Sequence, residues 1–138
     1  MTPNSMPQAQ LKAARNILLK LHKTLLDHER DRYEATQKPI NSTNEYLQLV
    51  LNDEWFAWLR VMSGLIVQID EAFDVKDPRM SEETALLLGA QTRKLLRPNA
   101  PDTHFSVNYE RALQQSPTAA AQHHEIMREL DNLLGKEV

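Results

Sequence analysis

Cysteine is absent from this chain of 138 residues, and glycine is scarce. The absence of cysteine excludes disulfide bonds, thiolate-bound zinc, cysteine-ligated iron–sulfur clusters and a cysteine nucleophile. Only Gly64, Gly89 and Gly135 occur, and so little glycine favours long helices over the many tight turns of a β-sheet protein. A chain of this length can bury a sufficient core without a disulfide or a metal. We therefore expect residues 1–138 to form one domain.

The chain also lacks a long apolar run and an excess of positive charge. Its most apolar run, residues 61–67, is far shorter than the roughly 20 residues that span a bilayer. The N-terminus has no basic stretch followed by an apolar segment, so we expect a cytoplasmic protein whose residues 1–7 form a disordered tail. The net charge is −3 and the pI is near 5.9, whereas nucleic-acid-binding proteins usually carry a basic face. We expect neither a nucleic acid nor a membrane as a partner.

Apolar residues at helical spacing predict a long first helix over residues 8–37. Its inward face is formed by Leu11, Ala14, Leu18, Leu21 and Leu25. Pro39 ends the helix, because proline cannot continue the hydrogen-bonded backbone. At about 1.5 Å per residue the helix would be roughly 45 Å long, which is typical of a helical bundle.

Two capping residues predict where the next helices begin. Ser42 and Glu45 form a capping box, which predicts a short helix over residues 43–51. Asn52 and Asp53 compete for backbone hydrogen bonds and favour a break, after which Asp53 caps a helix over residues 54–73. The alternative is one continuous helix through this point.

Two serines predict the helices of the second half. Ser81 is a favourable N-cap for a helix that ends near Leu96. Phe105, Tyr109, Ala112 and Leu113 form a short apolar stripe that begins near Thr103. Ser116 followed by Pro117 marks the beginning of the last helix, which ends at Gly135. The inward face of this last helix is predicted to contain Ala119, His123, Ile126, Leu130 and Leu133.

The segment 54–73 has the widest apolar face of the chain. One stripe contains Trp55, Leu59, Met62, Ile66, Ile69 and Phe73, and Phe56, Trp58, Val61 and Leu65 widen it. A face this wide indicates contact with more than one neighbour, so we expect the other helices to pack around this one. The predicted fold class is all-α: an up-down helical bundle of about four main helices with one or two extra short helices.

Polar residues on the apolar faces are the candidate metal ligands. The chain contains neither Glu-x-x-His nor His-x-x-x-His, so the usual two-ligand patterns of a single helix are missing. His22 and Glu29 nevertheless lie one heptad apart on the inward side of the first helix. His123 lies on the inward side of the last helix, and Asp70 flanks the stripe of the central one. If they converge they could bind a metal or transfer a proton; the alternative places each at the rim, solvated or hydrogen-bonded once.

The aromatic cluster Trp55, Phe56 and Trp58 is the second candidate site. Three aromatic side chains within four residues cannot all face one side of a helix. One interpretation is a surface for a protein partner or a second copy of the chain, because tryptophan is enriched at interfaces. The other is that the short helix over residues 43–51 folds back and covers Phe56.

The stretch EYLQLVLNDEWFAWLR from Glu45 to Arg60, with LIVQIDEA from Leu65 to Ala72, resembles a family of small all-helical bacterial proteins of unknown function. The resemblance implies a bacterial, cytoplasmic protein. It implies no activity, cofactor or functional residue for this chain.

The chain contains no phosphate-binding loop, dinucleotide-binding loop or nucleophile elbow. We therefore expect no cofactor and a protein that is not an enzyme, acting through protein–protein interaction or regulation as a homodimer or with another protein. The alternative is a helical bundle that binds a metal ion or a small ligand between its helices. An enzyme of unrecognised type ranks third.

Overall fold

The structure is a computed structural model that describes residues 6–76, 78–97 and 103–136. Its elements are α1 (Met6–Thr36), α2 (Thr43–Asn52), the 3₁₀ helix η1 (Glu54–Phe56), α3 (Ala57–Asp74), α4 (Glu82–Leu96), α5 (His104–Gln115) and α6 (Pro117–Leu134). Among the described residues there is no β-strand, and the one extended pairing is an isolated bridge between Lys76 and Arg79. The predicted all-α class is confirmed.

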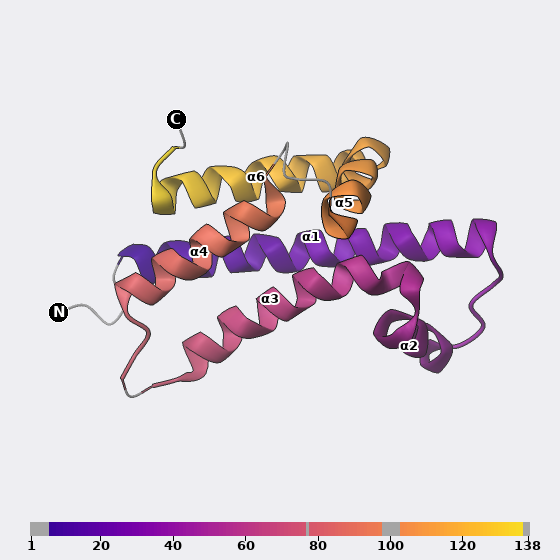
Figure 1. Ribbon diagram of the computed structural model, residues 1–138, viewed down its shortest axis with the longest axis horizontal. Coiled ribbons are helices and arrows are strands. Elements are labelled where there is room, and N and C mark those ends of the chain that lie inside the picture. The colour runs from indigo at the N-terminus through magenta and orange to yellow at the C-terminus, as the bar shows by residue number, and fades with distance from the viewer. Residues whose placement is uncertain (1–5, 77, 98–102, 137–138) are drawn as a thin grey trace.

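Helix α1 runs the length of the molecule (Figure 1). Helix α6 lies alongside it and runs in the opposite direction, and α3 lies on another side of α1, also antiparallel to it. Helix α4 crosses diagonally and packs against both α1 and α6. The short helices α2 and α5 lie near the end of α1 that is farther from its N-terminus, α2 against η1 and α3, and α5 against α3 and α6.

Helix α1, rather than α3, is the one around which the others pack. Helix α1 contacts α3, α4 and α6, whereas α3 packs mainly against α1, α2 and α5. The apolar face of α3 is narrower than expected, because Val61 is 50% exposed. The prediction that the segment 54–73 is the central helix is therefore wrong. The greater length of α1, 31 residues against 18 in α3, allows it to contact α3, α4 and α6.

The predicted inward face of α6 is confirmed in full. The five predicted residues, His123 among them, are all buried. Helix α6 thus buries a polar imidazole within an otherwise apolar stripe, a position that requires a hydrogen-bond partner.

The predicted helix starts are confirmed by hydrogen bonds from backbone N–H groups to capping side chains. Each of the four capping side chains accepts one such bond: Ser42 from Glu45, Asp53 from Trp55, Ser81 from Thr84, and Ser116 from Ala119. The break before residue 54 is confirmed as well, since α2 ends at Asn52 and η1 follows. The capping box at Ser42 is modified: the Glu45 carboxylate accepts from the Asn41 N–H, one residue farther back than expected.

Two residues that were expected in a disordered tail of residues 1–7 lie in a helix instead. Helix α1 begins at Met6, so Met6 and Pro7 are helical, and residues 1–5 lie outside the described part of the chain. Proline fits here because the first helical turn has no use for its missing N–H group. Within the described residues, no helix has the length and apolar character needed to cross a bilayer.

Candidate functional site

The Glu29 carboxylate is the most deeply buried charged group described, with a residue exposure of 1%. Its Oε1 atom accepts from the Trp58 indole N–H at 3.1 Å and from Arg111 Nη2 at 2.8 Å. Arg32 Nη1 lies 3.1 and 3.0 Å from the two carboxylate oxygens, and Arg111 Nη1 lies 3.3 Å from Oε2. We call Glu29, Arg32, Arg111 and Trp58 the Glu29 cluster.

Three helices supply the Glu29 cluster. Glu29 and Arg32 are three residues apart on α1, a spacing that puts both side chains on one side of the helix. Trp58 comes from the first turn of α3, and Arg111 comes from the third turn of α5. The cluster therefore joins α1, α3 and α5 through one carboxylate.

Trp55 supports the Glu29 cluster from η1. Its indole N–H donates to the backbone oxygen of Glu29 at 3.2 Å. The guanidinium of Arg32 lies over its ring, 4.6 Å from the centroid, and Tyr33 meets the same ring edge-on at 5.5 Å. A guanidinium held over an aromatic face is stabilised electrostatically and fixed in orientation.

The Glu29 cluster carries an excess of positive charge. One carboxylate faces two guanidinium groups, so the three charges sum to +1. Charge-assisted hydrogen bonds are short and strong, but desolvating three charges costs free energy that apolar side chains would not cost. The arrangement leaves a cationic environment beside a buried anion.

An open hollow of about 330 Å³ adjoins the Glu29 cluster. It is lined by Glu29, Arg32, Glu54, Trp55, His104 and Asn108, from α1, η1 and α5. The Asn108 amide is already engaged, because it donates to the His104 backbone oxygen and accepts from Arg111. Within the described part of the chain, the side chains of Glu54 and His104 have no hydrogen-bond partner. We call this space the Arg32 hollow.

The four predicted polar residues have different partners and do not converge. Asp70 forms a two-bond ion pair with Arg15 at 2.7 and 2.8 Å, which lowers the pKa of the Asp70 carboxyl. Arg15 and Glu29 are 14 residues apart on α1, about 21 Å along the helix, so Asp70 lies far from the Glu29 cluster. Among the described residues, no three His, Asp or Glu side chains are grouped so that they could hold a metal ion.

The two predicted histidines are also engaged separately. Burial lowers the pKa of His22, and the backbone of Leu59 offsets part of that effect. His123 Nδ1 and the Tyr109 hydroxyl are hydrogen-bonded at 2.7 Å, which joins α6 to α5. Burial, with a smaller contribution from nearby His124, lowers the pKa of His123 to about 4. Burial also raises the pKa of Tyr109, so both groups are neutral at pH 7.

Two of the three predicted surface aromatics point inward. Phe56 is 0% exposed and Trp58 is 1% exposed, while Trp55 is half-buried beside the Arg32 hollow. Tyr46 of α2 packs edge-on against Phe56, with ring centroids 6.1 Å apart. The short helix thus covers Phe56, which was the alternative interpretation of this cluster.

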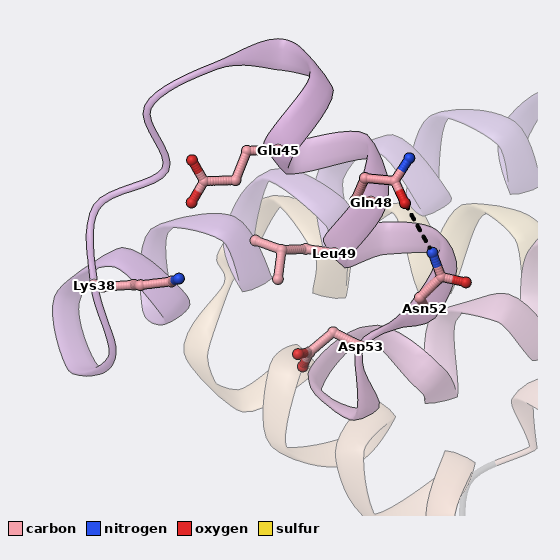
Figure 2. Close-up of a pocket in the computed structure, with 6 residues that line it drawn as sticks. All are labelled: Lys38, Glu45, Gln48, Leu49, Asn52 and Asp53. Atoms are coloured by element: carbon pink, nitrogen blue, oxygen red, sulfur yellow. Dashed lines mark hydrogen bonds between the residues drawn. The ribbon is translucent and has the colours of Figure 1, made fainter.

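A second hollow of about 280 Å³ lies between α2 and the connection that precedes it. Figure 2 shows Lys38 reaching toward Leu49, with the carboxylates of Glu45 and Asp53 on either side. Both carboxylates already accept backbone N–H groups, from Asn41 and Trp55 respectively. The lining contains no buried charged group, so this hollow is a weaker candidate than the Arg32 hollow.

No family model, curated protein or solved structure matches this chain. Its function must therefore be argued from its own geometry.

Sequence reasoning located part of the candidate site. It placed Glu29 on the inward side of the first helix, and it named Trp55 and Trp58 as members of an aromatic cluster. Arg111, Glu54 and His104 were missed, since each lies beside an apolar stripe rather than on it. The signal available was indirect: a carboxylate on an inward face needs a cationic partner from another helix, but nothing in the sequence says which cation.

Proposed function

We propose that this protein is a non-enzymatic binding protein that holds a small molecule with an anionic group in the Arg32 hollow. The observation that carries the proposal is the excess cation of the Glu29 cluster, which lies at the wall of that hollow. An anionic group beside Arg32 would offset the excess positive charge of the Glu29 cluster. The proposal extends the expectation of a helical bundle with a ligand between its helices.

The geometry of Arg32 supports an anion. Its hydrogen bonds to Glu29 use Nη1 alone, so Nε and Nη2 are not committed to that carboxylate. A guanidinium presents its N–H groups in a planar fork that fits carboxylate and phosphate oxygens. The side chain is 32% exposed, which leaves it accessible from the hollow. Trp55 and the buried cluster fix its position, so little ordering is required when a ligand binds.

The scaffold for this site is a bundle. We infer that α1, α3, α4 and α6 are its four main helices and that α2 and α5 are the extra short ones. In this scheme α5 is the element that closes the hollow, because it supplies His104 and Asn108 while Arg111 ties it to α1.

The test follows the two indole N–H groups by ¹H–¹⁵N NMR, because the chain has only two tryptophans. Acetate and inorganic phosphate are titrated up to about 10 mM, a range that detects dissociation constants in the millimolar region. We expect saturable shifts of the Trp55 indole and the Arg32 Nε–H signals. Arg32→Lys, which keeps the charge but removes the fork, is expected to weaken binding by at least about tenfold.

The matched control is Arg30→Lys, on the same helix, because Arg30 lies over Tyr46 and pairs with Glu34 away from the hollow. This variant is expected to bind as the unmodified chain does. Absence of a saturable shift for both probes, or equal losses in the two variants, contradicts the proposal.

A protein partner or a homodimer is the second candidate function. With Phe56 and Trp58 buried, the exposed apolar residues available for an interface are aliphatic, such as Leu47 and Leu51 one turn apart on α2. Light scattering after size exclusion, compared between the unmodified chain and Leu47→Gln, measures this directly. A strictly monomeric protein at high concentration contradicts the dimer.

A further inference from the structure

We infer that the ligand of the Arg32 hollow is a small zwitterion, a molecule that carries an ammonium group as well as an anionic group. This inference rests on the proposed function and specifies the chemical class of its ligand. It comes from a carboxylate without a hydrogen-bond or ion-pair partner among the described residues, which lines the same hollow as Arg32.

Glu54 supplies that carboxylate. It is the first residue of η1 and is exposed, and among the described residues its side chain has no hydrogen-bond or ion-pair partner. The bond that caps η1 is accepted by the neighbouring Asp53 and not by Glu54. The Glu54 side chain is therefore available to a ligand.

Arg32 and Glu54 give the hollow one cationic and one anionic side. Trp55 lies next to both, following Glu54 in η1 and packing its ring under the Arg32 guanidinium. Consecutive side chains of a 3₁₀ helix diverge by about a third of a turn. The Glu54 side chain therefore leaves η1 in a different direction from the Trp55 ring that packs against Arg32.

This charge pattern discriminates between ligands. A plain carboxylate gains from Arg32 but is repelled by Glu54, and a plain ammonium ion gains from Glu54 but is repelled by the Glu29 cluster. A molecule with both charges pairs with both sides. His104, at the beginning of α5, offers one further polar group at the edge.

The size of the hollow limits the ligand further. A volume of about 330 Å³ lies at the small end of the usual range for ligand sites, which is about 300–1,000 Å³. It suits a free amino acid or another small amino carboxylate.

The experiment compares molecules with the same carbon skeleton. The zwitterionic probes are 2-aminobutyrate and 4-aminobutyrate; butyrate and butylammonium each carry one of the two charges. Titrations follow the Trp55 indole N–H. We expect at least one zwitterion to bind the unmodified chain about tenfold or more tightly than butyrate. In Glu54→Gln that advantage is expected to fall to within about threefold, while butyrate binding improves.

The control is Glu110→Gln, which removes one exposed acid from α5 and leaves Glu54 in place. It is expected to keep the preference for the zwitterion. Equal binding of butyrate and both zwitterions overturns this inference but leaves the proposed function standing. A preference that survives in Glu54→Gln also overturns it. No binding of any probe contradicts both proposals.

Discussion

Glu29 shows how strongly one buried carboxylate depends on its partners. Its two oxygens accept from Arg32, Arg111 and Trp58, and at a residue exposure of 1% solvent can do little to replace a lost partner. Removal of one member of a buried ion pair leaves the remaining charges desolvated and unpaired.

We therefore predict that Glu29→Gln is strongly destabilising. The neutral amide keeps the shape of the side chain but leaves two guanidiniums without a counter-charge, so the free energy of unfolding is expected to fall by about 3 kcal/mol. Urea unfolding measures this change. Asp27→Asn, on the same helix, removes only the exposed pair with Lys23 and is expected to cost less than about 0.5 kcal/mol. Equal effects of the two substitutions would show that the cluster contributes little.

At the scale of the helices, the Tyr109–His123 hydrogen bond couples α5 to α6. The pKa of His123 falls from 6.5 to about 4 in the folded chain. Between these values the unfolded chain binds a proton that the folded chain does not. The free energy of unfolding must therefore decrease as the pH falls through this window.

The predicted loss for His123 is about 2 kcal/mol between pH 7 and pH 5. Urea unfolding at several pH values measures the slope, to which the lowered pKa of His22 adds with the same sign. His123→Gln is expected to flatten the slope, whereas His124→Gln, at an exposed neighbouring position, is expected to retain it. A slope that is unchanged in His123→Gln would mean that this imidazole stays protonatable in the folded protein.

Helix boundaries and inward faces were predictable because they depend on local chemistry. The side chains of Ser81 and Ser116 cap their helices by accepting a hydrogen bond from the backbone N–H three residues later. The apolar stripe of α6 follows from the helical period of 3.6 residues per turn. The pairing of Glu29 with Arg111 was not predictable. These residues are 82 positions apart, and their meeting depends on how α5 docks on α1, which no local pattern encodes.

The same limit explains why the central helix was misjudged. The width of an apolar stripe reports how much side-chain surface is buried, not how many neighbours share it. In α3 the wide aromatic end is buried against η1, α2 and Phe105 of α5. In α1 a thinner stripe is extended over a much longer helix that three others contact.

At the scale of the whole molecule, we expect resistance to local unfolding to be highest in α1, because the other main helices pack around it. Helix α1 contains fully buried residues along most of its length, such as Leu18, Leu21 and Leu25, whereas α2 contains no buried residue. Segments with few buried contacts open locally, and core segments exchange their amide protons only through global unfolding. Helix α2 packs mainly against η1 and α3, with Arg30 of α1 over the Tyr46 ring as a further contact, so its opening leaves most of the core in place.

We predict that native-state hydrogen exchange divides the chain accordingly, with the amides of α2 exchanging at least about 100-fold faster than those of α1 near Leu21. Leu21→Ala should lower the free energy of exchange of the protected amides in α1, α3, α4 and α6 together by about 2–5 kcal/mol. The reason is that it creates a cavity in the core where these helices pack against α1. Leu49→Ala, in α2, should lower protection in α2 and η1 alone. If Leu49→Ala instead accelerated exchange across α1 and α6, α2 would belong to the cooperative core, and the short helix would hold the bundle together rather than merely cover Phe56.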